Sequence, residues 1–169
     1  MLIVFGGLPS TGKTAIAREL ARQLGTVHLR VDSIEQALRD DGVAGRSVED
    51  AGYQVAYAIA ADNLCIGRIV IADSVNPLAV TRDAWVAVAQ RTGARIVEVE
   101  VLCSDRDEHR RRAEMRISDI PGLTLPTWQE IVSREYHPWA REHIVVDTAL
   151  RSVEQSVKML REAIAAQSE

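Results

Sequence analysis

Long apolar runs and paired cysteines are both missing from this sequence of 169 residues. No stretch approaches the roughly 20 apolar residues that a membrane-spanning helix requires. Cys65 and Cys103 stand far apart without C-x-x-C or Cys/His spacing, which argues against a disulfide framework and a zinc site. The apolar start, residues 1–5, is too short for a signal peptide and has no basic leader. We therefore expect a soluble, cytoplasmic protein with two reduced thiols in its core.

An excess of positive charge is absent as well. The formal net charge is −4 and the isoelectric point is about 5.6, so the protein as a whole does not attract nucleic acid or an anionic membrane. We expect neither as a partner. With 47% hydrophobic residues, the chain is long enough for one sizeable core and too short for two ordinary domains. The prediction is a single domain over residues 1–169.

Short apolar runs alternate with amphipathic segments along the chain. The apolar runs predict strands at 2–5, 27–31, 69–72, 95–102 and 144–146. Helical spacing predicts helices over 15–24, from Ser33 onward, over 48–64, from Asn76 to about 91, and over 153–164. Alternating strands and helices indicate an α/β fold of three layers, with a parallel sheet covered on both faces.

Capping residues predict where these helices begin and end. Gly25 is placed to end the first helix, and Asn76 with Pro77 to begin the fourth. Capping boxes are predicted at Ser33–Gln36 and at Ser152–Gln155. Residues 40–46 are polar and predict a loop, and the segment 109–128, with four arginines followed by a loop containing two prolines and a glycine, predicts a lid.

The loop after the first strand carries the most specific motif. Residues 7–14, GLPSTGKT, match G-x-x-x-x-G-K-[ST], the Walker A motif or P-loop, between a predicted strand and a predicted helix. Such a loop points backbone N–H groups at phosphates, and the following helix adds its positive end. The residues expected to bind the nucleotide are Gly7, Leu8, Pro9, Ser10, Thr11, Gly12, Lys13, Thr14 and Ala15.

Two residues of this motif have specific expected roles. Lys13 can reach the β- and γ-phosphates, and Thr14 offers a hydroxyl to Mg²⁺. The alternative is a glycine-rich turn that binds nothing. A dinucleotide-binding loop would need G-x-G-x-x-G, which is absent here.

Two aspartates follow strands, where open α/β sheets collect their ligands. Asp32 is expected to orient an attacking hydroxyl or accept its proton, and its structural alternative is a helix N-cap. Asp73 is expected to hold Mg²⁺ directly or through water, with acceptor binding or a plain turn as alternatives. Arg82 either faces the same cleft or is a solvated surface charge.

The arginines of the lid supply further candidates. Arg112 and Arg116 stand four residues apart and share a face if the segment is helical. Arginines on a mobile segment can neutralise the charge that develops during phosphoryl transfer. The alternative is a solvated helix on which Glu108 and Arg112 form an exposed ion pair.

Two later groups have structural alternatives of their own. Tyr136 and Trp139 are interpreted as an interface between helix and core. Asp147 and Thr148 either line the base pocket of a nucleotide or cap a loop. The four histidines show no metal-ligand spacing.

Taken together, Gly7 to Thr14, Val31-Asp32-Ser33-Ile34, Ile71-Ala72-Asp73-Ser74 and Val146-Asp147-Thr148 resemble the small P-loop kinases of the AAA_33 type. This group includes chloramphenicol phosphotransferase, the polynucleotide kinases and the zeta-toxin-like kinases, and the resemblance covers nearly the whole chain. Polynucleotide kinases differ in having an arginine where this chain has Glu35.

The resemblance implies a sheet ordered 2-3-1-4-5 with a helical lid. It implies Asp32 as catalytic base, Lys13 and Thr14 as phosphate and Mg²⁺ ligands, and lid arginines at Arg112 and Arg116. ATP rather than GTP also rests on it.

The sequence thus predicts an ATP- and Mg²⁺-dependent phosphotransferase that acts on the hydroxyl of a small molecule, as chloramphenicol phosphotransferase does. The acceptor pocket is expected along residues 33–57. A nucleoside or nucleotide kinase stays open as an alternative, and so does a nucleotide-dependent ATPase or switch without an acceptor.

Overall fold

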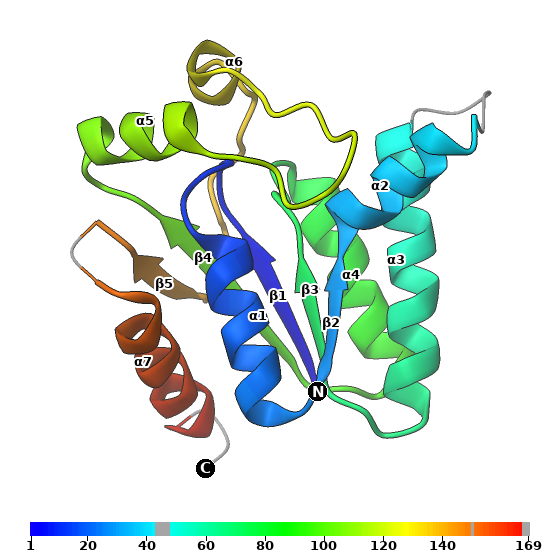
Figure 1. Ribbon diagram of the computed structural model, residues 1–169. Coiled ribbons are helices and arrows are strands. Elements are labelled where there is room, and N and C mark those ends of the chain that lie inside the picture. The colour runs from blue at the N-terminus through cyan, green and yellow to red at the C-terminus, as the bar shows by residue number, and fades with distance from the viewer. Residues whose placement is uncertain (43–47, 150, 167–169) are drawn as a thin grey trace.

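A parallel sheet of five strands forms the centre of the computed structural model, which describes residues 1–42, 48–149 and 151–166. The strands are β1 (Leu2–Gly6), β2 (Val27–Arg30), β3 (Val70–Asp73), β4 (Ile96–Leu102) and β5 (Ile144–Asp147). Their order is β2-β3-β1-β4-β5 (Figure 1), which confirms the order that the resemblance implied. Every pairing is parallel, so the carboxyl ends of all five strands meet at one edge.

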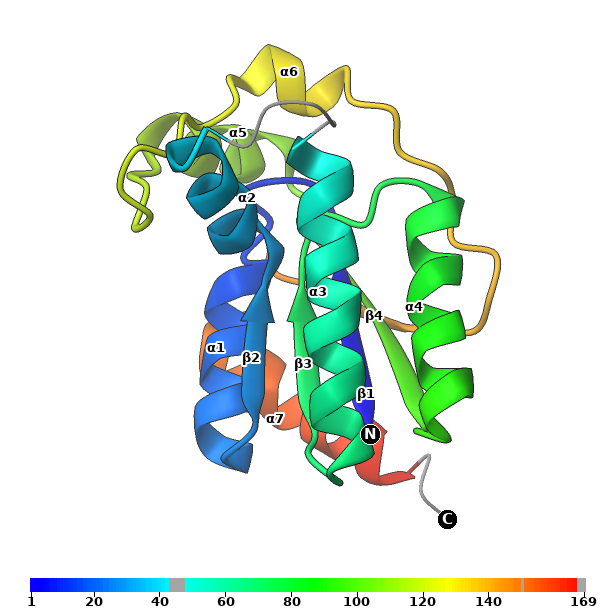
Figure 2. The same cartoon turned by 90° about the vertical axis from the view of Figure 1, so that its right-hand side faces the viewer.

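Helices cover both faces of this sheet, which gives the predicted three layers. The helices α1 (Lys13–Leu24) and α7 (Val153–Ala166) pack on one face, and α3 (Val48–Cys65) and α4 (Ala79–Thr92) pack on the other (Figure 2). Side chains alternate along a strand, so Ile3 and Phe5 join the core beneath α1 while Leu2 and Val4 join the core beneath α3. Strand β1 is therefore buried on both faces and holds the loop that follows it.

The remaining helices lie at the carboxyl edge of the sheet. They are α2 (Val31–Asp40), α5 (Arg106–Met115) and α6 (Trp128–Val132). The chain between α5 and α6 crosses from the β4 side toward α2 above the strand ends (Figure 1). This is the segment expected to form a lid. None of the described helices is long and apolar enough to cross a membrane.

Two predicted helix starts are wrong. Helix α2 begins at Val31 with Arg30 at its N-cap and no side-chain cap, so Ser33 and Gln36 do not form the expected capping box. Helix α4 begins at Ala79 after Leu78, so Asn76 does not cap it. Gly25 does end α1 in the left-handed conformation, and Ser152 and Gln155 exchange the two hydrogen bonds expected of a capping box.

Two other expectations meet the structure only in part. Cys65 and Cys103 are free thiols, but Cys65 is exposed, so the expectation of two core thiols is wrong. The predicted loop at 40–46 falls partly on residues outside the described ranges.

Asn76 is drawn into the core instead of capping a helix. Its side chain is fully buried, its Nδ2 donates to Phe5 O at 2.6 Å, and its Oδ1 accepts from Trp85 Nε1 at 3.1 Å. Its φ of 48° lies in the left-handed region that asparagine tolerates better than most residues. One side chain therefore ties the end of β1 to α4.

Arg82 also contradicts both interpretations given to it, because it neither lines the cleft nor meets solvent. It is 2% exposed and donates to the carbonyl oxygens of Asn76, Pro77, His137 and Pro138. Its guanidinium lies 4.8 Å from the ring centroid of Trp139. Trp139 is thus part of a structural interface, as predicted.

We predict that Asn76→Ala destabilises the protein by about 2–4 kcal/mol, because it leaves a buried donor and a buried acceptor unpaired. Unfolding in urea, followed by circular dichroism, measures this. Asn63→Ala, on the partly exposed side of α3, is the control and should cost less than about 1 kcal/mol. An Asn76 variant as stable as that control would contradict the role given to this side chain.

Candidate active site

The loop between β1 and α1 is a tight turn with its backbone pressed against β4. Gly7 has a φ of +132°, and a Cβ at this position would lie 2.0 Å from Val101 O. Ser10, at φ 65°, and Gly12, at φ +98°, also take the left-handed conformation. Gly12 is the N-cap of α1 and no side chain caps the helix, so its first N–H groups are available to an anion.

Lys13 begins α1 and lies almost entirely inside the protein. Its Nζ donates to Leu8 O at 2.8 Å, and the residue is 7% exposed. Burial lowers the pKa of Lys13 to about 8, although Asp73 and Asp32 counteract the shift. A carbonyl is a weak partner for an ammonium group, so this lysine is held where a phosphate would bind it more strongly.

Asp73 and Asp32 lie at the same edge, on neighbouring elements. Asp73 ends β3, is 2% exposed, and its Oδ2 lies 3.1 Å from His28 Nε2. Asp32 is in the first turn of α2 with its side chain 36% exposed. The sequence assigned no role to His28, because the contact depends on the pairing of β2 with β3.

A cleft of about 1280 Å³ joins these groups. Of the predicted site residues, Lys13, Thr14, Asp32, Asp73, Arg112 and Arg116 line it, as do Pro9, Ser10, Gly12 and Ala15. Gly7, Leu8 and Thr11 do not line it, but Leu8 O accepts hydrogen bonds from Thr11 Oγ1 and Lys13 Nζ within the loop. Pockets for one small ligand usually measure about 300–1,000 Å³, so this cleft has room for a nucleotide and a second molecule.

Sequence comparison identifies the family. A family model described as an AAA domain, AAA_33, matches residues 2–134. The chain belongs to this family. No curated protein matches it.

Solved structures show the same fold at low sequence identity. APS kinase CysC from Mycobacterium tuberculosis in complex with AMPPNP and APS has a TM-score of 0.72 at 21% identity, over 99% of this chain and 97% of that one. Kti12 from Chaetomium thermophilum in complex with ADP-AlF3 has a TM-score of 0.68 at 24% identity, over 97% and 99%. A sugar kinase from Janibacter sp. HTCC2649 has a TM-score of 0.71 at 16% identity, over 97% and 94%. The fold is that of a kinase-like P-loop nucleotide-binding protein.

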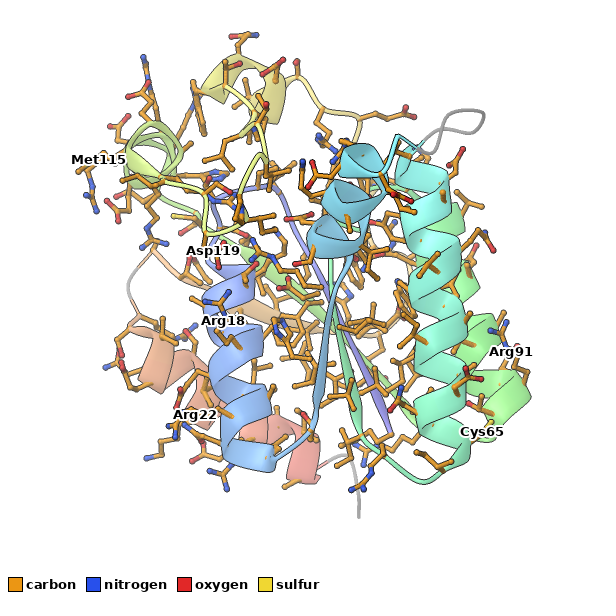
Figure 3. The ribbon with its side chains drawn as sticks, turned by 45° about the vertical axis from the view of Figure 1, so that its right-hand side comes forward. Arg18, Arg22, Cys65, Arg91, Met115 and Asp119 are labelled. Carbon is orange, nitrogen blue, oxygen red and sulfur yellow. The ribbon has the colours of Figure 1, made fainter. Side chains whose placement is uncertain are left out.

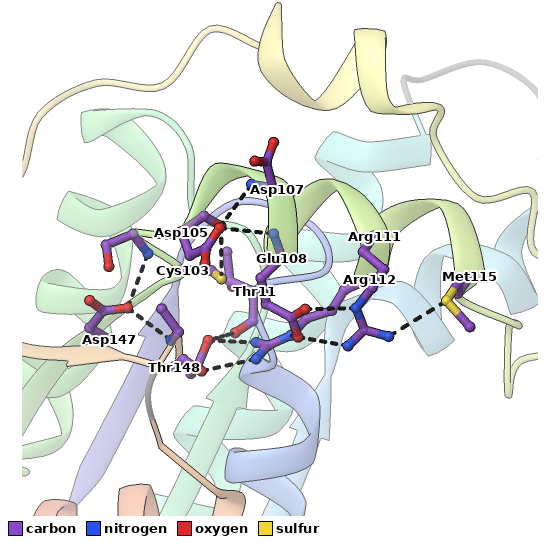
Figure 4. Close-up of polar contacts among 12 residues, drawn as sticks. Thr11, Cys103, Asp105, Asp107, Glu108, Arg111, Arg112, Met115, Asp147 and Thr148 are labelled. Carbon is purple, nitrogen blue, oxygen red and sulfur yellow. Dashed lines mark hydrogen bonds and ion pairs between the residues drawn. The ribbon is translucent and has the colours of Figure 1, made fainter.

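The lid arginines do not share a helix face as predicted, because α5 ends at Met115 and Arg116 follows in an extended conformation. Arg112 is anchored instead. It donates to Thr148 Oγ1 and Thr148 O, both at 2.9 Å, and to Glu108 Oε1 at 2.7 Å (Figure 4). The ion pair with Glu108, given as the structural alternative, is therefore present on an arginine that also lines the cleft.

Two residues hold the P-loop through contacts that the sequence did not predict. His109 is 6% exposed, and its Nε2 donates to Pro9 O at 2.8 Å while its ring packs edge-on to Trp128. Thr148 Oγ1 donates to Thr11 O at 2.8 Å. Asp147 accepts from the N–H groups of Ser104 and Ala149, which is the loop cap weighed for it. The P-loop is thus fixed from α5 and from the end of β5.

The lowered pKa of Lys13 predicts how stability depends on pH. Between about pH 8 and 10.5 the unfolded chain binds the lysine proton and the folded chain does not, so stability rises with pH across this window. Lys13→Met removes the buried charge. At pH 7 it should be more stable than the wild type by up to about 3 kcal/mol, and the difference should shrink toward pH 10.5.

Urea unfolding at several pH values between 7 and 10.5 measures this difference. Lys158→Met, which replaces an exposed lysine of α7, should follow the wild type at every pH. A Lys13→Met difference that does not change with pH would contradict the lowered pKa of this buried lysine.

Proposed function

We propose that this protein is an ATP-dependent phosphotransferase that transfers the γ-phosphate to a hydroxyl group of a small molecule. The observation that carries the proposal is one continuous cleft with a P-loop and a buried lysine on one side and the carboxylate of Asp32 on another. The family and the fold support nucleotide binding. The size of the cleft favours a second substrate over a switch that binds a nucleotide alone.

Each group of cleft residues has its own role in the proposed transfer. The P-loop N–H groups and Lys13 bind the β- and γ-phosphates and hold the terminal phosphate in the cleft. Asp32 accepts the proton of the attacking hydroxyl while the hydroxyl oxygen forms a bond to the γ-phosphorus. The bond from that phosphorus to the bridging oxygen of ADP breaks at the same time. Arg112 and Arg116 stabilise the negative charge on the transferred group.

The oxygen ligands present suit a magnesium ion. The Thr14 hydroxyl and the Asp73 carboxylate line the same cleft, and Mg²⁺ takes few protein oxygens when phosphates and water complete its shell. The described residues contain no cluster of three or more His, Cys, Asp or Glu side chains that would bind a metal without the nucleotide. When bound, the ion would neutralise charge on the phosphates.

The acceptor site would lie between α2, the start of α3 and the lid. Part of the predicted 33–57 wall lines the cleft, through Glu35, Gln36, Arg39, Asp50 and Tyr53. Most of these side chains are charged or polar, which favours a hydrophilic acceptor such as a sugar or a nucleoside derivative over an apolar antibiotic.

We predict that Asp32→Asn lowers acceptor-dependent turnover by about 10²–10⁴-fold, the usual loss when a general base is removed. The affinity for MgATP, measured by calorimetry, should stay within a factor of about three. ADP release during a screen of hydroxyl compounds gives the turnover. Asp62→Asn, on the exposed side of α3, is the matched control. Turnover that no hydroxyl compound accelerates, in the wild type as in the variant, would support an ATPase or switch instead.

A further inference from the structure

Arg30 ends β2 and is a buried cation that the phosphotransfer scheme does not use. Its side chain is 8% exposed and lines the same cleft as Lys13. Strand β3 separates β2 from β1, the strand that leads into the P-loop. Arg30 therefore lies on the side of the cleft where the acceptor is proposed to bind, next to α2. A charged group buried to this degree costs several kcal/mol unless counter-charges and hydrogen bonds compensate it.

The guanidinium of Arg30 is only partly satisfied. Its Nη1 donates to Asp119 Oδ1 at 2.9 Å, and within the described ranges its Nε has no hydrogen-bond partner. Its Nη2 lies 3.9 Å from Asp32 Oδ2, too far for a hydrogen bond. The end of a guanidinium formed by Nη1 and Nη2 can bind two oxygens of one anion, and here Asp119 occupies only Nη1. The Nη2 group of that end lies beside the candidate base.

Among the described residues, the carboxylate that accepts a hydrogen bond from Arg30 comes from the lid. Asp119 belongs to the loop between α5 and α6, and its Oδ2 accepts from Arg18 of α1 at 2.5 Å (Figure 3). Hydrogen bonds from Arg18 and Arg30 hold the pKa of Asp119 well below its usual range, so it is ionised at neutral pH. Its side chain is 48% exposed, so it bridges two arginines from a loop at the rim of the cleft.

We propose that Arg30 binds an anionic group of the acceptor, a carboxylate or a phosphate or sulfate ester, and that Asp119 takes the place of this group while the acceptor is absent. The proposal rests on the proposed function, because it names the class of hydroxyl compound that the enzyme uses. The substrate would carry its anionic group close to the hydroxyl that faces Asp32. Asp119 would leave Arg30 when this group binds, and remain near Arg18.

The competing explanation is that the contact between Arg30 and Asp119 is purely structural and only holds the lid in place. The two explanations predict different signs for the changes in acceptor affinity. If Arg30 and Asp119 only hold the lid down, Arg30→Gln and Asp119→Asn break the same contact and change acceptor affinity in the same direction. If Asp119 competes with the acceptor, the two substitutions have opposite effects. Arg30→Gln removes the anion site, whereas Asp119→Asn removes its competitor.

The first experiment measures binding without turnover. The P-loop is filled with magnesium and a non-hydrolysable ATP analogue, and the protein is titrated with inorganic phosphate, sulfate, glycerate, gluconate, glycerol and glucose. We expect the wild type to bind one or more of the anions more tightly than the neutral compounds. Arg30→Gln should weaken that binding by about tenfold or more, and Asp119→Asn should strengthen it by about threefold or more. Comparing the carboxylates with phosphate and sulfate identifies the anionic group.

Three further variants keep the test decisive. Arg30→Lys keeps the charge but loses the two-point edge, so it should bind anions with intermediate affinity even if Arg30→Gln folds poorly. Arg22→Gln and Glu114→Gln remove surface ion pairs on α1 and α5 and should leave binding unchanged. Equal shifts in the same direction for Arg30→Gln and Asp119→Asn, or anion binding that ignores both, would overturn the proposal.

The second experiment separates this proposal from the proposed function. Acceptor-dependent ADP release is measured with the same anionic and neutral compounds and the same variants. Turnover of neutral acceptors that is unaffected by Arg30→Gln, with no inhibition by the anions, would overturn the anionic acceptor and leave the phosphotransferase standing. Anion binding that depends on Arg30, without turnover of any compound, would retain the anion site and remove the phosphotransferase.

Discussion

The burial of positive charge at the carboxyl edge of the sheet is the constraint on which the site depends. Lys13 and Arg30 both line the cleft, and each is nearly withdrawn from water. A buried cation needs an oxygen partner. Lys13 donates a hydrogen bond to Leu8 O, and Arg30 donates one to the carboxylate of Asp119 in the lid. Leu8 O is a neutral partner and Asp119 contacts only Nη1 of Arg30, so an anionic ligand in the cleft would compensate both cations more fully.

The same constraint explains why the lid has two unequal parts. Helix α5 is fixed to the P-loop through His109 and to the end of β5 through Arg112. The loop beyond Met115 has no regular structure up to α6, and through Asp119 it is bound to Arg18 of α1 and to Arg30 at the end of β2. The predicted lid segment therefore contains a helix that belongs to the nucleotide side and a loop that reaches the acceptor side. A ligand that replaces Asp119 acts on the loop and leaves the helix in place.

The sequence predicted most of what depends on local pattern. The strands, the P-loop and the C-cap at Gly25 follow from apolar runs and glycine spacing, and the resemblance supplied the strand order. The errors come from partners distant in the chain. Asn76 looked like a cap because its core partners, Phe5 O and Trp85, cannot be read from neighbouring residues, and Arg82 looked accessible because two of its carbonyl partners lie 55 and 56 positions away. His109 and Asp119 were missed for the same reason, since their partners are up to 101 residues distant.

One such error bears directly on the chemistry. The predicted helix began at Ser33, so Asp32 was expected just ahead of it, with a helix N-cap as its structural alternative. In the structure α2 starts at Val31, so Asp32 lies one residue inside the first turn, where a carboxylate is favoured by the helix dipole and is not used as the N-cap. Its side chain instead borders the cleft, with Oδ2 3.9 Å from Nη2 of Arg30. A hydroxyl and an anionic group held at that separation would meet Asp32 and Arg30 together, which is why the acceptor is better described by its charge than by its carbon skeleton.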